Sequence, residues 1–331
     1  MSKLAAYLRL MRISLLPTAW SNVLMGFALV VMPSPSANHW WALPCLLVCS
    51  SCLYLAGMVL NDVFDVELDR VERPERVLPS GLIPVQRAHL FGWGLLVAGV
   101  LLAGAASLVL SMADGSAGTL NVSPLLVAFV LAGLVVLYNA WAKRSPSGPL
   151  VMGLCRSMNV LLGCSVYAWE PVLAGFDAAS LIVAGAMGLY IAGITLFARE
   201  EQRTSHRRYL LMGASAMLAG VAILFWFPFS EAFAWLDSVK RDAKVDGSRH
   251  LFLYAGLLAM MLFPVFRRVT VAMATRESHD VQSAVIISLL TIIMIDASIC
   301  YLVSPETPAY ALVVAALLIP AWLMSRRISA T

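Results

Sequence analysis

Residues 41–69 read WALPCLLVCSSCLYLAGMVLNDVFDVELD, an apolar run over 41–60 followed directly by an acidic stretch. A run of this length can cross a bilayer as a helix. Asp62, Asp65 and Asp69 follow it at i, i+3 and i+7 spacing, so they share one face if the helix continues. Like charges on one face repel each other, and carboxylate oxygens suit Mg²⁺ that also holds a phosphate. The stretch therefore predicts a cation site at a membrane edge.

The composition of the whole chain is that of an integral membrane protein. Of its 331 residues, 60% are hydrophobic and 13% are charged, and the mean hydropathy is +0.83. A soluble domain would carry about a quarter of charged residues. We expect an all-α, multi-pass bundle that forms a single membrane domain over 1–331. Its nine to ten apolar spans are predicted at 13–32, 41–60, 89–112, 124–142, 149–169, 179–198, 209–229, 250–266, 282–303 and 308–325.

The connecting segments alternate between rich and poor in Lys and Arg. Segment 61–88 has four arginines and segment 33–40 has no Lys or Arg, and only 230–249 departs from the alternation. By the positive-inside rule this predicts ten spans, with both termini and the acidic stretch on the cytoplasmic side. We expect a bacterial inner membrane, with the first span retained in the mature protein. The net charge of +4 thus reflects topology, and we expect no nucleic acid as a partner.

The acidic stretch is followed by RPERVLPSG over 73–81, where proline ends the helix. Two interpretations of this stretch remain open. Arg70, Arg73 and Arg76 can simply neutralise the three aspartates in a polar loop. Alternatively, the acids hold a metal and the arginines hold the anion that the metal also binds.

These residues resemble a known family. Asn-Asp-x-x-Asp-x-x-x-Asp at the end of the second span is similar to the first Asp-rich motif of the UbiA prenyltransferase superfamily, and 73–81 looks like the stretch that follows it, with Val77 replacing a proline. The resemblance covers roughly 10–230. It implies a helical bundle around a central cavity and a Mg²⁺-dependent transfer of a prenyl group from a prenyl diphosphate to a hydrophobic or aromatic acceptor among the membrane lipids. Carried over, it assigns substrate binding to Asn61 and metal binding to Asp62, Asp65 and Asp69.

The fourth span ends in Tyr138-Asn139-x-x-x-Lys143-Arg144. This pattern is similar to the Tyr/Lys stretch with which the family contacts the diphosphate. The alternative is a positive-inside anchor with a tyrosine at the membrane interface. The resemblance therefore implies that Tyr138 binds substrate and that Lys143 is catalytic.

Arg156 and Asn159 lie on one face inside the fifth span. An arginine within the membrane is costly and should face a partner or a wet cavity. It contacts either an anion or acceptor in the cavity, or a structural partner such as Asp296. Asn22, in the first span, is a further candidate for the cavity wall.

The region of the second Asp-rich motif, 198–203, departs from the family. The sequence contains no aspartate between Asp177 and Asp237. Glu200 and Glu201 are adjacent and point about 100° apart on a helix, so they do not reproduce an i, i+4 pair. Either one glutamate binds a single metal while Arg199 and Arg203 clamp the anion, or metal chemistry has been lost here.

Two functions follow from these patterns. The first is a membrane prenyltransferase in which an apolar cavity shields a carbocation. The second is a non-catalytic carrier of a polar lipid or metabolite that works with partner proteins in biosynthesis or export, as suggested by similarity to the UbiA-like EboC subgroup. For the enzyme, the expected catalytic groups are Asp62, Asp65, Lys143 and Arg156; the expected substrate contacts are Asn61, Arg73, Arg76, Tyr138, Asn159, Arg199 and Asn22; and the expected Mg²⁺ ligands are Asp62, Asp65, Asp69, Glu200 and Glu201.

Overall fold

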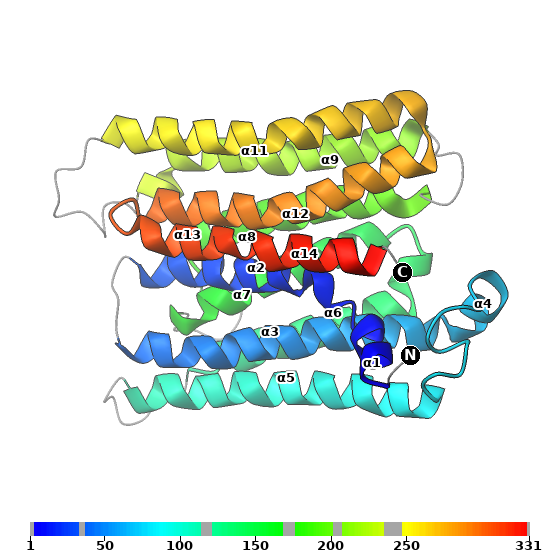
Figure 1. Ribbon diagram of the computed structural model, residues 1–331. Helices are drawn as coiled ribbons and strands as arrows, with labels where there is room; N and C mark the ends of the chain where they lie inside the picture. The colour runs from blue at the N-terminus through cyan, green and yellow to red at the C-terminus, as the bar shows by residue number, and fades with distance from the viewer. Residues whose placement is uncertain are drawn as a thin grey trace.

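The computed structural model is an all-helical bundle (Figure 1). It describes residues 3–32, 37–113, 121–167, 176–200, 207–234 and 247–329. The α-helices are α1 (Lys3–Leu10), α2 (Leu16–Val31), α3 (Ala37–Phe64), α4 (Val66–Glu72), α5 (Val85–Ala113), α6 (Ser123–Ala140), α7 (Gly148–Cys164), α8 (Ala178–Phe197), α9 (Arg207–Trp226), α11 (Gly247–Thr275), α12 (Ser278–Val303), α13 (Pro308–Ala316) and α14 (Leu318–Ser329). Short 3₁₀ turns are η1 (Ile13–Leu15), η2 (Ala142–Arg144), η3 (Ser165–Tyr167), η5 (Ala198–Glu200) and η6 (Phe227–Phe229).

The expected all-α membrane bundle is confirmed. Among the described residues, nine helices are long and apolar enough to cross a membrane. The tenth apolar segment, Pro308–Met324, is shorter and is divided between α13 and α14. In Figure 1 the two helices follow one another along the bundle, and both chain ends lie at the same end of it as α4.

Small residues let α2 and α7 come close together. A Cβ added to Gly26 of α2 would lie 2.2 Å from the carbonyl oxygen of Val160, and one added to Gly163 of α7 would lie 2.2 Å from that of Val23. Membrane helices use such residues because backbones can then approach closely. The close approach places the polar residues of these two helices against each other in the bundle interior.

The acidic stretch does not continue α3 as one regular helix. α3 ends at Phe64, Asp65 has φ −97° and ψ 1°, and the short α4 begins at Val66. α4 projects beyond the end of the bundle in Figure 1. The shared face that the i, i+3, i+7 spacing predicts for an unbroken helix is therefore not formed as such.

A small hydrophobic cluster holds α1 and the segment after α4 against the ends of α3 and α5. Residues from all of these parts are buried together: Ala6, Leu10, Val59, Val66, Leu78, Ile83 and Ala88. Burial of each aliphatic side chain removes apolar area from water, which stabilises this arrangement at the polar end of the bundle. The N-terminal helix is thereby placed beside the acidic stretch.

Candidate functional site

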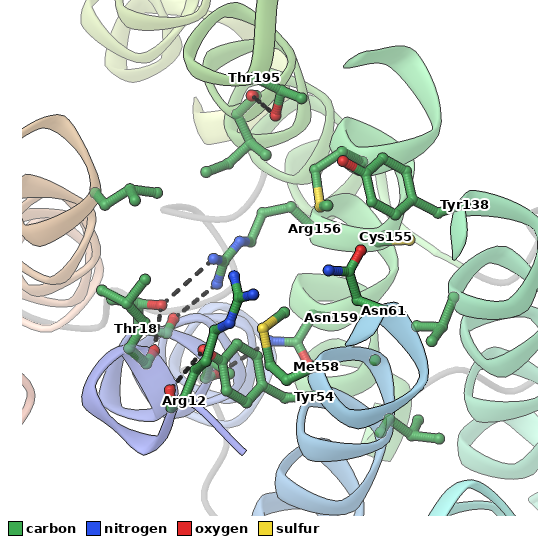
Figure 2. A pocket seen from close by; sticks show the side chains of 18 of the residues that line it. Arg12, Thr18, Tyr54, Met58, Asn61, Tyr138, Cys155, Arg156, Asn159 and Thr195 are labelled. Atoms are coloured by element: carbon green, nitrogen blue, oxygen red, sulfur yellow. Dashed lines mark hydrogen bonds between the residues drawn. The ribbon is translucent and has the colours of Figure 1, made fainter. Parts of the chain in front are cut away.

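A cavity of about 530 Å³ lies between α2, α3, α6, α7, α8 and α12. Its wall is mostly apolar and includes Leu53, Met58 and Ile194. Two arginines line it, Arg12 from the segment before α2 and Arg156 from α7, whereas its described wall contains no Asp or Glu. Figure 2 shows the side chains of both arginines directed into the same space. The central cavity is thus an apolar chamber with positive charge, which suits a ligand with an apolar body and an anionic group.

Asp62 and Asp69 share one arginine. Arg76 Nη1 lies 2.7 Å from Asp69 Oδ2 and 3.9 Å from Asp62 Oδ1, while Arg12 Nη2 donates to Asp62 Oδ1 at 2.9 Å. Both carboxylates are almost completely buried, so their charges need these partners. Because Arg12 also lines the central cavity, it connects the acids with the chamber.

Asp65 faces a different pair of cations. Lys143 Nζ lies 2.8 Å from Asp65 Oδ2, and Arg144 Nη2 lies 3.1 Å from Oδ1. Lys143 also donates to Asn61 Oδ1 at 3.2 Å, and Asn61 lines the cavity. Burial lowers the pKa of Lys143 below its ordinary value of 10.5, and the hydrogen bond to Asp65 acts in the opposite direction. We call Asp62, Asp65 and Asp69 with these cations the acidic mouth.

The acidic mouth matches the neutralisation interpretation only in part. Arg76 does neutralise two of the aspartates, but Arg70 pairs with Glu67 at 2.7 Å, and Arg73 forms no ion pair with a described residue. Within the described part of the chain, no group of three His, Cys, Asp or Glu side chains is gathered as metal ligands would be. The arrangement is therefore one of carboxylates that each contact a cation.

A second polar cluster lies deeper in the bundle. Arg156 Nη1 donates to Asn22 Oδ1 at 2.7 Å and to the Thr18 carbonyl at 3.0 Å, and Asn22 Nδ2 donates to Asp296 Oδ2 at 2.7 Å. Ser21 Oγ donates to the same carboxylate oxygen at 2.5 Å. We call these five residues the interior network. Arg156 thus both lines the cavity and is linked to Asp296, which combines the two alternatives that the sequence leaves open.

The remaining predicted substrate contacts lie in the cavity wall or at its rim. Asn159 donates to the carbonyl of Ala19 at 2.9 Å and accepts from Ser50 at 2.7 Å. Tyr138 lines the cavity next to Cys155 in Figure 2. Asn22 does not reach the described wall itself and instead supports Arg156 from behind.

The region of the second motif is described only to residue 200. Arg199 donates to the carbonyl of Ser145 at 3.0 Å, which ties η5 to the segment between α6 and α7. The side chain of Glu200 and all of Glu201 lie outside the described residues, as does Arg203. Their predicted part in metal or anion binding stays a prediction.

Two residues that the sequence interpretation missed face the cavity. Arg12 has the left-handed backbone angles φ 45° and ψ 50°, which are uncommon for a residue with a side chain and recur at functional sites. Nothing in its sequence neighbourhood distinguishes it from an ordinary positive-inside residue. Tyr54 donates to the Arg12 carbonyl at 3.2 Å, and its i, i+7 spacing to Asn61 was a usable signal for the same helix face.

Comparison with known sequences identifies relatives along most of the chain. The family model described as "UbiA prenyltransferase family" matches residues 14–330. Digeranylgeranylglyceryl phosphate synthase of Sulfurisphaera tokodaii is 28% identical over 195 residues, which is 58% of this chain and 60% of that protein. The synthase of Methanocaldococcus jannaschii is 35% identical over 108 residues, 31% of this chain and 35% of that protein. The chain thus spans 60% or less of the length of these curated relatives.

Solved structures share the fold. One, from work on digeranylgeranylglyceryl phosphate synthase in membranes, superposes with a TM-score of 0.61 at 18% identity and covers 92% of this chain and 99% of its own. A UbiA homologue from Archaeoglobus fulgidus bound to DMAPP and Mg²⁺ gives a TM-score of 0.53 at 14% identity, with 94% and 99% covered. The family match includes the helices that form the cavity, the acidic mouth and the interior network, and the chain therefore belongs to the UbiA prenyltransferase family.

Proposed function

We propose that this protein is a membrane prenyltransferase that transfers a prenyl group from a prenyl diphosphate to a hydrophobic acceptor. The observation that carries the proposal is the direct connection, through Arg12 and Asn61, between the acidic mouth and an apolar cavity of about 530 Å³. A prenyl diphosphate has the matching shape, with an anionic head and an apolar tail. The relatives named above support this substrate class.

The acidic mouth fits Mg²⁺ by its donor chemistry. Carboxylate oxygens of Asp62, Asp65 and Asp69, with the amide oxygen of Asn61, are the hard ligands that Mg²⁺ prefers, commonly together with substrate phosphates. Their present cation partners are groups that can equally contact phosphate oxygens. When bound, Mg²⁺ would neutralise charge that develops on the diphosphate leaving group.

The chain's own residues have separate tasks in this proposal. Lys143 and the arginines near the mouth, Arg12 and Arg76 with Arg73 beside them, stabilise the departing diphosphate by their positive charge. The apolar wall excludes water from the allylic cation that remains when the C–O bond breaks. Tyr138 and Asn159 border the space in which the acceptor then attacks.

The orientation is part of the proposal. The termini and the acidic mouth lie at the same end of the bundle, and the Lys/Arg distribution favours the cytoplasmic side for this end. A cytoplasmic mouth of a bacterial inner-membrane protein would meet soluble Mg²⁺ and prenyl diphosphates. A C-terminal reporter enzyme that is active only outside the cytoplasm tests this, and activity of that fusion would contradict the orientation.

The activity test uses purified protein, radiolabelled prenyl diphosphates of several chain lengths, Mg²⁺ and a membrane lipid extract as acceptor source. We expect release of diphosphate together with label in a new lipid product. A known family enzyme assayed in parallel serves as the control. If neither label transfer nor diphosphate release occurs with any chain length, the proposal is wrong.

A second candidate function is a non-catalytic carrier of a polar lipid or metabolite, acting with partner proteins. It is favoured by the complete pairing of the described aspartates with cations and by the missing aspartates at 198–203. Complementation with Asp62→Asn and Asp65→Asn separates the two functions. Full activity of both variants favours the carrier, and loss of activity favours the enzyme.

A further inference from the structure

A fully buried carboxylate, Asp296 on α12, belongs to none of the motifs considered above. It lies 18 residues beyond Ser278, about 27 Å along the helix at 1.5 Å per residue. Its Oδ2 accepts hydrogen bonds from Ser21 and Asn22, whereas its Oδ1 has no hydrogen-bond partner among the described residues. An ionisable residue at such depth is costly to the fold, which suggests a functional reason for its presence.

Asn22 stands between this acid and Arg156. Its amide nitrogen donates to Asp296 at 2.7 Å and its amide oxygen accepts from Arg156 at 2.7 Å, so both ends of one side chain are used. No direct ion pair joins Arg156 and Asp296 in the described structure, whose ion pairs all lie elsewhere. The negative charge therefore reaches the guanidinium through a polarised amide.

The indirect link leaves part of the guanidinium available. Arginine has five N–H donors in a fixed planar fork. Those of Arg156 that contact the protein go to Asn22, to the Thr18 carbonyl and, at 3.4 Å, to Thr18 Oγ1. A bidentate pair with a carboxylate would have used two further donors on one edge. In Figure 2 Arg156 instead extends into the cavity beside Arg12.

We infer that Asp296 is a positioning residue which, through Asn22, holds Arg156 as an oxyanion-binding group inside the central cavity, apart from the acidic mouth. Asp296 supplies the charge balance and Asn22 supplies the geometry, while the free donors of Arg156 contact phosphate or carboxylate oxygens of a substrate. This rests on the proposed function for the identity of the substrates. The oxyanion comes either from the diphosphate of the donor or from an acidic head group of the acceptor.

The test measures binding to the purified full-length protein by calorimetry, without turnover. Inorganic pyrophosphate with Mg²⁺ represents the donor head, and glycerol phosphate represents an acidic acceptor head. We expect R156Q, D296N and N22S each to weaken binding of one of these probes by about tenfold or more, the loss typical of a charged hydrogen bond. The probe that is affected identifies the source of the oxyanion.

A double variant supplies the decisive comparison. If Asp296 acts through Arg156, D296N should add less than about twofold to the loss already caused by R156Q, since coupled residues are not additive. S298A is the matched control, because Ser298 is also buried on α12 but bonds only to the carbonyl of Met294 in its own helix. It should bind both probes as the wild type does.

Thermal unfolding separates positioning from a merely structural role. N22S changes no charge, so it carries the test if D296N fails to fold. Wild-type binding of both probes by D296N or N22S, independent and additive losses in the double variant, or no binding of either probe by the wild type would each overturn the inference. Oxyanion binding that follows the expected pattern in a protein without prenyl transfer would leave this inference standing and remove the proposed function alone.

Discussion

The acidic mouth and the interior network both combine carboxylates with arginines, yet they do so in opposite ways. At the mouth, Asp62 and Asp69 contact cations directly, and several of those cations are partly exposed: the Arg12 side chain retains 41% of its accessible surface. In the interior, Asp296 has no exposed surface and meets Arg156 only through an amide. Exposed ion pairs are weak and exchange readily, whereas a buried charge must be held by hydrogen bonds.

This difference separates two tasks within one chamber. Direct pairs at the mouth can open when a metal and a diphosphate offer stronger partners, because water can solvate the displaced side chains. The interior network has no such freedom, since any movement would leave a charge unpaired in the membrane. We therefore expect the mouth to respond to ligand and the interior to stay as it is.

The largest expected effect comes from the mouth. Asp65→Asn removes the carboxylate that contacts Lys143 and Arg144, and as a proposed Mg²⁺ ligand its loss should lower kcat/KM for prenyl transfer by about 100-fold or more. Transfer of radiolabel under Mg²⁺ saturation measures this. Glu67→Gln is the matched control, because Glu67 is an exposed acid of the same stretch and pairs only with Arg70. Equal activity of the two variants would contradict the role of Asp65.

The next largest effect concerns the protonation of Lys143. Burial lowers its pKa from 10.5, so its positive charge is lost earlier than that of an exposed lysine as the pH rises. We expect kcat/KM to fall by about tenfold for each pH unit above the lowered pKa, because only the charged form stabilises the leaving group. Lys143→Arg should shift this decline to higher pH, since arginine stays charged. An unchanged profile in that variant would assign the decline to another group.

The sequence predicted the fold and most of the mouth because each has a local signal. Apolar runs specify helices that cross a membrane, and the spacing of Asp62, Asp65 and Asp69 points to one acidic site. The interruption at Asp65 was not predictable, since it depends on how α4 packs against Val59 and Leu78.

The contacts between distant segments were beyond such reasoning. Arg12 meets Asp62 across 50 residues, and Asn22 meets Asp296 across 274. The intramembrane Arg156 was noticed for its cost, and Asp296 was named as one acid that could pair with it. Nothing in the spacing indicated that Asn22 would stand between them, because this follows from the close approach of α2 and α7 at two glycines.

A smaller effect should distinguish the two regions by their response to ligand. Inorganic pyrophosphate at about 100 times its dissociation constant stabilises a folded protein by about 2.7 kcal/mol, or several degrees in Tm. We expect this shift to require Mg²⁺ and to disappear with a chelator or in Asp62→Asn. The Tm of the ligand-free protein should not change with the chelator, since the described carboxylates already have cation partners. A lower Tm on chelation alone would show a metal bound in the resting state.

The smallest effect is expected at Arg70, which the sequence placed among the possible partners of the motif acids. Its side chain instead contacts Glu67 on the exposed surface of α4, with 53% and 78% of the two side chains accessible. An exposed pair of this kind contributes a few tenths of a kcal/mol at most after solvent screening. Arg70→Ala should therefore leave both Tm and transfer within about twofold of the wild type, whereas Arg76→Ala should lower both because Asp69 would be left buried without its cation. Parallel unfolding and transfer measurements on the two variants make the comparison, and a loss in Arg70→Ala as large as that in Arg76→Ala would mean that α4 moves onto the mouth when substrate binds.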